Sequence, residues 1–259
     1  MLADLRRRLV RLRRQGLART PRLRRTPAGA VLKFGTGKPL VNFCGNDILG
    51  LAAHPAVRAA ARAGISRWGW GSGASRLVTG TTEAHASLET ALAAFHGRPA
   101  ALLYGTGYQA NVGALPALLG RDDLVLSDAL NHASLIDGCR LSGARIRVYR
   151  HADLGHLESL LRAARGRRRP WIVTDAVFSV DGDLAPLEDI ADLAGRYRAG
   201  TFVDEAHAIG VFGPQGRGRV AALGLSARFD VVVGTLSKAL GGVVGLGAGT
   251  LDSAVLKQV

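Results

Sequence analysis

The sequence predicts an α/β fold in which a mainly parallel sheet is flanked by helices. Short runs of apolar residues alternate with stretches of helical periodicity along most of the chain, a pattern typical of repeated strand–helix units. Several runs are apolar throughout, as expected for strands that are covered on both faces. The seven predicted strands are Ala101–Tyr104, Leu124–Ser127, Arg145–Tyr149, Trp171–Thr174, Thr201–Asp204, Val231–Gly234 and Val243–Gly247.

Two of the helices between these strands have clear sequence signals. Pro186 begins one of them, acidic residues occupy its first turn, and Gly200 follows its last basic residues, an order that is favourable at both helix ends. Its apolar residues are Leu187, Ile190, Leu193 and Ala194. The second helix is predicted over about 83–96, with Leu88, Leu92 and Phe95 on one face.

Composition restricts the class of protein. The chain has 259 residues, of which 47% are hydrophobic, so a large buried core is possible. We find no run of about 18 apolar residues, the length needed for a membrane helix, and expect no membrane partner. Cys44 and Cys139 are far apart and in no metal-ligand spacing. This arrangement indicates neither a disulfide framework nor a metal site, and it favours a cytoplasmic location.

Charge divides the chain into a basic N-terminal helical arm over 1–38 and a large domain over 39–259. Residues 1–30 contain ten Arg and one acid, a net charge of +9 out of the +14 of the whole chain. Leucines at helical spacing near the start predict an amphipathic helix. Three interpretations of the arm stay open: a helix that packs on the domain, a mitochondrial presequence or a nucleic-acid tether. We expect no nucleic-acid partner, because the arm has no aromatic residue to stack on bases.

Reactive side chains follow several of the predicted strands. In open α/β sheets, ligands bind at the carboxyl ends of the strands, so these residues are candidates for one site. Lys238 comes directly after the apolar run 231–234 and the sequence Thr235-Leu236-Ser237. A buried lysine there is costly unless it is paired or chemically used. One interpretation is a Schiff base with pyridoxal 5'-phosphate (PLP); the other is a lysine that points to water.

A carboxylate and a histidine follow a second strand. Asp204 ends the run 201–204, and His207 lies three residues later. A carboxylate at this place can keep a pyridine nitrogen protonated, and the histidine can reach the ring's phenolic oxygen. The alternative is a capping aspartate with a polar loop histidine.

Three further segments complete the candidate site. Gly107 and Tyr108 open a predicted helix after a strand, where free backbone N–H groups can bind a phosphate; the alternative is an ordinary strand–helix turn. His132 follows another strand and can stack on a ring, although a lone histidine is more often structural. Ser179 follows a fifth strand and can hydrogen-bond to the ring substituents.

Taken together, these segments resemble the α-oxoamine synthase family of PLP enzymes. The resemblance extends from about residue 40 to the end. The motifs that carry it are Asn46-Asp47-Ile48-Leu49-Gly50-Leu51, Gly71-Ser72-Gly73-Ala74-Ser75-Arg76, Asn131-His132-Ala133-Ser134, Val177-Phe178-Ser179-Val180-Asp181-Gly182-Asp183, Asp204-Glu205-Ala206-His207 and Thr235-Leu236-Ser237-Lys238.

The resemblance implies a fold-type-I PLP-dependent transferase large domain and a role for each candidate residue. Lys238, His132 and Asp204 would be the catalytic residues: the Schiff-base lysine, the ring-stacking histidine and the partner of the pyridine nitrogen. The implied cofactor-binding residues are Gly107, Tyr108, His132, Ser179, Asp204, His207, Thr235 and Lys238. The implied substrate-binding residues are Arg19, Asn46 and His132.

The resemblance also implies a PLP-dependent C-acyltransferase. Members condense an amino acid with an acyl thioester and release carbon dioxide. The branch that this sequence most resembles joins L-alanine to pimeloyl-CoA or pimeloyl-ACP in biotin biosynthesis, as a homodimer. The alternatives are the glycine C-acetyltransferase, 5-aminolevulinate synthase and serine palmitoyltransferase types.

Length is the main departure from the family. Its members continue past the lysine into a C-terminal small domain that carries an arginine for the substrate carboxylate, whereas this chain has 21 residues after Lys238. We therefore expect the small domain to be absent and the turnover of this chain to be low. A truncated, non-catalytic remnant is the alternative from another functional class.

Overall fold

The computed structural model describes residues 1–164 and 169–249. Contacts divide the chain into two units, one from Met1 to Gly45 and one that begins at Asn46. Lys257, one of the four lysines, lies outside the described residues. None of the helices within the two described ranges is long and apolar enough to cross a membrane.

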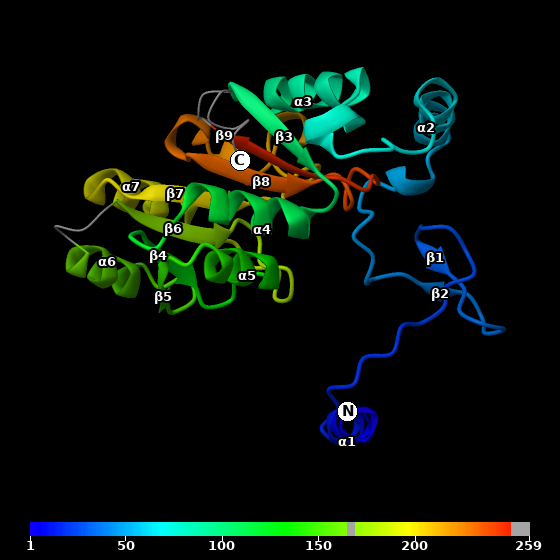
Figure 1. Ribbon diagram of the computed structural model, residues 1–259, viewed down its shortest axis with the longest axis horizontal. Helices are drawn as coiled ribbons and strands as arrows, with labels where there is room; N and C mark the ends of the chain where they lie inside the picture. The colour runs from blue at the N-terminus through cyan, green and yellow to red at the C-terminus, as the bar shows by residue number, and fades with distance from the viewer. Residues whose placement is uncertain (165–168, 250–259) are drawn as a thin grey trace. The chain divides into compact units, whose positions relative to one another are not determined.

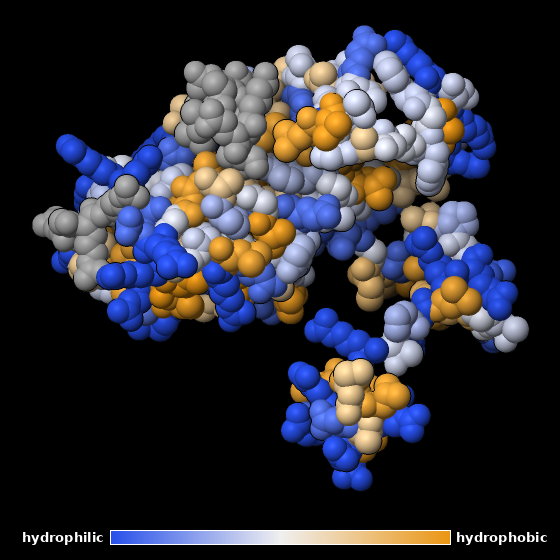
Figure 2. All heavy atoms as spheres, viewed as in Figure 1, coloured by the Kyte–Doolittle hydropathy of each residue, from blue (hydrophilic) through white to orange (hydrophobic). Residues whose placement is uncertain are grey.

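The first unit contains the predicted N-terminal helix. α1 covers Leu2–Arg14, and Leu2, Leu5 and Leu9 remain exposed; Figure 2 shows hydrophobic and hydrophilic side chains together on the surface of this helix. β1 (Val31–Leu32) and β2 (Leu40–Val41) pair antiparallel. This pairing carries the unit past residue 38, the predicted end of the arm.

The second unit contains the main sheet and its helices (Figure 1). Its strands are β3 (Ala100–Tyr104), β4 (Leu124–Asp128), β5 (Arg145–Tyr149), β6 (Pro170–Asp175), β7 (Gly200–Asp204), β8 (Val231–Thr235) and β9 (Gly245–Gly249). Its helices are α2 (Pro55–Trp68), α3 (Glu83–His96), α4 (Gly107–Leu118), α5 (Ala133–Leu141), α6 (Leu154–Ala163), α7 (Leu187–Tyr197) and α8 (Arg219–Ala222). Short helical turns cover Leu51–Ala53, Arg76–Gly80, Pro214–Gly216 and Ser226–Arg228.

Within the described residues, the main sheet has seven strands in the order β3-β9-β8-β7-β6-β4-β5, which confirms the predicted number. All neighbouring pairs are parallel except those that involve β9, which is antiparallel to both β3 and β8. Only residues 236–244 connect β8 to β9. A parallel crossover needs a dozen or more residues, so this short connection requires a reversal of direction.

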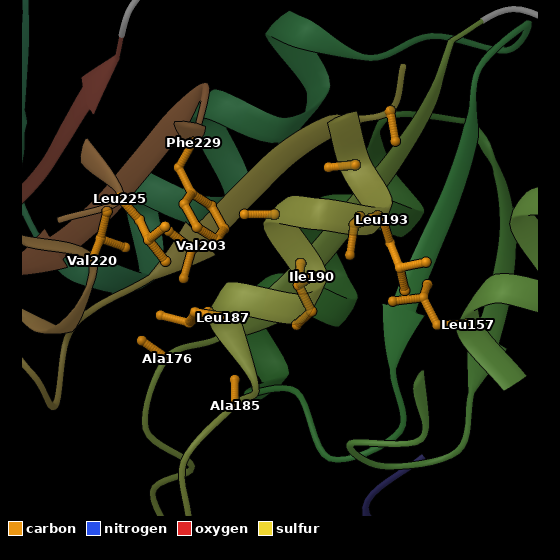
Figure 3. Close-up of a cluster of buried hydrophobic side chains, with 14 of the residues drawn as sticks. Leu157, Ala176, Ala185, Leu187, Ile190, Leu193, Val203, Val220, Leu225 and Phe229 are labelled. Atoms are coloured by element: carbon orange, nitrogen blue, oxygen red, sulfur yellow. The ribbon is translucent and has the colours of Figure 1, made fainter. Parts of the chain in front are cut away.

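The core occupies both faces of the sheet, because side chains of a strand alternate between its faces. Ile172 and Val203 pack with α6 and α7 on one face (Figure 3). Their chain neighbours Val173 and Phe202 pack with α4 and α5 on the other. A third cluster joins Leu92 of α3 to β3 and β9. Coverage of both faces explains why the strands read as continuous apolar runs.

The end of α7 differs from the prediction. The helix ends at Arg198, which has a left-handed φ of 53°, whereas Gly200 is already the first residue of β7. A side chain at Gly200 would collide with the ring of Trp171 on the neighbouring strand. The glycine is therefore required for close packing within the sheet, not for helix termination.

Candidate active site

A cavity of about 220 Å³ lies at the carboxyl ends of the parallel strands. The turns after β3, β4, β7 and β8 contribute to it, because parallel strands bring their carboxyl ends to one edge of the sheet. Seven of the predicted site residues line it: Gly107, Tyr108, His132, Asp204, His207, Thr235 and Lys238. The structure thus brings together residues that are up to 131 positions apart, from Gly107 to Lys238.

Lys238 contributes a side-chain amine to this cavity. Burial lowers its pKa below the ordinary value of 10.5, although the carboxylates of Asp204 and Asp175 oppose the change. A lower pKa increases the fraction of the side chain that is a neutral amine, the form that attacks a carbonyl carbon. The turn that holds it is tied to β9, because Leu236 donates a backbone hydrogen bond to the carbonyl of Val244.

Asp204 presents a fixed carboxylate to the same cavity. It is the last residue of β7 and is 5% exposed. The backbone N–H of Ala206 donates to Oδ1 over 2.8 Å. The side-chain amide of Asn111, on α4, donates to Oδ2 over 2.7 Å. Two donors, one to each oxygen, fix the plane of the carboxylate.

Gly107 and Thr235, here called the cradle, lie in contact where α4 begins. Gly107 is the first residue of α4, and the helix is capped by Thr106, whose Oγ1 accepts a hydrogen bond from Gln109 N–H over 3.1 Å. A Cβ atom at Gly107 would lie 3.3 Å from Cβ of Thr235, so the helix start and the end of β8 are in close contact. The first turn of a helix leaves backbone N–H groups free, and these bind anions.

Two histidines line the cavity from different turns. His132 caps α5, and its Nδ1 lies 2.7 Å from Oγ of Ser134. Burial, followed by the charge of Lys238, lowers the pKa of His207 to about 4. His207 is therefore neutral near pH 7, when it can donate or accept a hydrogen bond.

Asp175 is a second buried carboxylate in the cavity, and we predicted no role for it from the sequence. It ends β6 and is 4% exposed, and its Oδ2 accepts the backbone N–H of His132 over 2.7 Å. Burial and the nearby charge of Asp204 raise the pKa of Asp175 to about 8. Its place at a strand end was the available signal, since the other site residues follow strands in the same way.

Replacing Asp175 with asparagine should change how stability depends on pH. The folded pKa lies above the unfolded value of 3.8, so the stabilising contribution is complete below that value and is lost as pH rises through about 8. Between pH about 5 and pH about 8, the free energy of unfolding of the wild type should fall relative to the variant by more than about 1 kcal/mol. Urea unfolding at both pH values measures this difference.

The matched control is Asp181→Asn, in an exposed turn. Asparagine at position 175 keeps an oxygen that accepts the N–H of His132, so the local hydrogen bond is retained. The two variants should differ from each other in their pH dependence. Identical pH profiles for Asp175→Asn and the wild type would contradict the upward shift of the Asp175 pKa.

Three predicted site residues do not line this cavity. Ser179 is exposed in the turn that follows β6; His151 holds this turn by its contact with Asp183, with 2.6 Å between Nε2 and Oδ2. Asn46 is exposed at the start of the second unit, and Arg19 belongs to the first unit. The roles of these three residues stay predictions.

Comparison with known proteins gives a consistent result. The family described as aminotransferase class I and II matches residues 38–259. An 8-amino-7-oxononanoate synthase from Nitrosococcus oceani is 54% identical over 228 residues, which cover 88% of this chain and 60% of the relative. The chain therefore spans about 60% of the length of this curated relative.

Two solved structures are also similar. A serine palmitoyltransferase from S. paucimobilis, with bound PLP–myriocin aldimine, superposes with a TM-score of 0.88 at 32% identity over 96% of this chain and 63% of its own. An 8-amino-7-oxononanoate synthase from Francisella tularensis superposes with a TM-score of 0.71 at 30% identity over 83% of this chain and 59% of its own.

Proposed function

Because this chain belongs to the α-oxoamine synthase branch of the aminotransferase class I and II family, we propose that it is the PLP-binding part of an enzyme that condenses L-alanine with a pimeloyl thioester. The products would be 8-amino-7-oxononanoate, carbon dioxide and the free thiol, as in biotin biosynthesis. The observation that carries the proposal is one cavity that holds Lys238, Asp204 and the cradle of Gly107 and Thr235.

The cavity fits PLP in four respects. The cradle at the start of α4 suits a phosphate, because Gly107 and Thr235 are in contact and a side chain at Gly107 would crowd Thr235. Asp204 offers a carboxylate for the pyridine nitrogen. Lys238 offers an amine whose pKa is lowered by burial. His207, neutral near pH 7, suits the phenolic oxygen of the ring.

The chemistry divides between the cofactor and the chain. When bound, PLP withdraws electrons from the α-carbon of an amino acid. Asp204 keeps a proton at the pyridine nitrogen, so that the ring accepts these electrons. Lys238, as a neutral amine, removes the proton from the α-carbon of alanine and later returns one. His132, which lines the same cavity, would stack on the ring of bound PLP and restrict its orientation.

The choice of alanine and a pimeloyl thioester is supported by sequence similarity. The identity of 54% to an 8-amino-7-oxononanoate synthase is well above the 32% to a serine palmitoyltransferase. The higher TM-score of the serine palmitoyltransferase favours that enzyme type as the alternative, with L-serine as the amino acid. We further propose a homodimer in the cytoplasm, without nucleic-acid or membrane partners.

A spectroscopic comparison of amino acids tests the substrate. The PLP-loaded protein is titrated with L-alanine, glycine or L-serine in D₂O, with and without pimeloyl-CoA. We expect L-alanine to change the absorbance of bound PLP at the lowest concentration and to exchange its α-proton for deuterium. A stronger response to L-serine would favour the palmitoyltransferase type, and no response to any amino acid would contradict the proposal.

A further inference from the structure

A chain of hydrogen bonds in the wall of the cavity connects His132 to Asp204 through Ser134 and Asn111. The side-chain nitrogen of Asn111 lies 2.7 Å from Oδ2 of Asp204 and 2.8 Å from Oγ of Ser134. The same Oγ lies 2.7 Å from Nδ1 of His132. Asn111 and Ser134 are 0% and 1% exposed, so water does not compete for these bonds.

The direction of the bonds in the chain follows from its two ends, Asp204 and the backbone N–H of Ser134. The NH₂ group of Asn111 donates to Oδ2 of Asp204. The second hydrogen of that group points to Ser134 Oγ, which accepts it. The hydroxyl hydrogen of Ser134 is then available for Nδ1 of His132. The backbone N–H of Ser134 also donates to Nδ1, over 3.2 Å, so Nδ1 is an acceptor and the proton of neutral His132 lies on Nε2.

The orientation of Asn111 leaves one of its polar atoms without a hydrogen-bond partner, and this indicates that its two donated bonds have a role. Its side-chain Oδ1 is buried without a hydrogen-bond partner, which is unfavourable for a polar atom. A residue that served only to fill this space would be apolar. Asn111 is instead placed to donate two hydrogen bonds from one nitrogen, to side chains of two different elements.

We propose that Asn111 and Ser134 are positioning residues of the PLP site: Asn111 orients the carboxylate of Asp204, and Ser134 fixes the ring of His132 with Nε2 protonated. The inference rests on the proposed function and deepens it. Neither residue needs to touch the cofactor. Together they set the positions of Asp204 and His132 relative to each other, through one buried amide.

¹⁵N NMR of the histidine side chains, in protein without PLP, tests the role that we propose for Ser134. The full 259-residue chain contains seven histidines, and His132→Gln assigns the signal of interest. In ¹⁵N-histidine-labelled wild-type protein above pH about 8, we expect Nδ1 of His132 to be unprotonated and Nε2 to carry the proton. Ser134→Ala should shift the Nδ1 resonance, because it removes a donor.

Ser142→Ala is the matched control for this measurement. Ser142 is also buried, at the other end of α5, and its Oγ donates to the carbonyl of Cys139 over 2.6 Å. Its removal should leave the His132 resonances unchanged. A protonated Nδ1 in the wild type, or an Nδ1 resonance that Ser134→Ala does not move, would overturn the proposal whether or not PLP binds.

The affinity of the protein for PLP tests the role that we propose for Asn111. Asn111→Leu removes both donors and leaves Oδ2 of Asp204 without this hydrogen bond, so the unliganded protein should unfold at a lower temperature than the wild type, while circular dichroism should show that it is folded at the temperature of the titration. The Kd for PLP should nevertheless rise about tenfold or more, because a hydrogen bond to a charged group is lost. An unchanged Kd, with PLP bound normally by the wild type, would overturn the role of Asn111. A wild type that binds no PLP would contradict the proposed function itself.

Discussion

Replacement of Lys238 by alanine is expected to abolish covalent attachment of PLP. Lys238 lies in the cavity beside Asp204 and His207, and burial lowers its pKa. No other lysine lines that cavity in the described part of the chain. The variant can still hold PLP through its phosphate, but the cofactor should leave the variant completely on gel filtration in denaturant. The wild type reduced with borohydride should keep it.

The matched controls are Lys33→Ala and Lys38→Ala, both in the first unit. Each of these variants should keep the same amount of reduced cofactor as the wild type. Circular dichroism should show that all three variants retain the helix and strand content of the wild type. Reduced PLP that remains on Lys238→Ala in stoichiometric amount would exclude the assigned role of this lysine.

Replacement of Asp204 by asparagine is expected to weaken PLP binding by about 10- to 100-fold, the loss that follows when a hydrogen bond to a charged group is removed. The carboxylate is held by Ala206 and Asn111, so its position is fixed before any ligand arrives. Asparagine has the same shape but cannot keep a proton on the pyridine nitrogen. Fluorescence titration of the unliganded protein with PLP measures the change in Kd.

Glu205→Gln is the matched control for Asp204→Asn. Glu205 is the next residue in the chain and is 1% exposed, but its carboxylate accepts a hydrogen bond from Val220 N–H over 2.7 Å and does not line the cavity. Burial raises the pKa of Glu205 to about 7, so glutamine resembles its protonated form. A Kd that changes equally in both variants would mean that the effect comes from the fold and not from the pyridine nitrogen.

The strands could be predicted because each crosses a core that is apolar on both faces. Strands such as 201–204 and 231–234 can therefore be recognised as continuous apolar runs, without an alternation of apolar and polar residues. All seven predicted strands have counterparts in the main sheet. The helix over 83–96 could be predicted because Leu88, Leu92 and Phe95 recur at helical spacing, and the structure shows that Thr82 caps its start and Gly97, with φ of 62°, ends it. β9 begins two residues later than predicted, because its glycines give no side-chain pattern to mark a boundary.

The candidate site could be predicted only in part. Gly107, His132, Asp204 and Lys238 follow strands, and the rule that parallel strands bring their carboxyl ends together is enough to group them. Asn111 and Ser134 lie inside α4 and α5, and nothing in their spacing shows that they meet beside the cavity. Their contacts depend on how α4 and α5 pack on one face of the sheet, which is tertiary information.

Peptide mapping of the reduced protein tests the central claim most directly. The 259-residue chain is loaded with PLP, reduced with borohydride and digested, and the modified lysine is identified by mass spectrometry. We predict a single pyridoxyl group on Lys238, the lysine that lies in the cavity with Asp204 and the cradle of Gly107 and Thr235. A pyridoxyl group on Lys33, Lys38 or Lys257 in place of Lys238 would contradict the account.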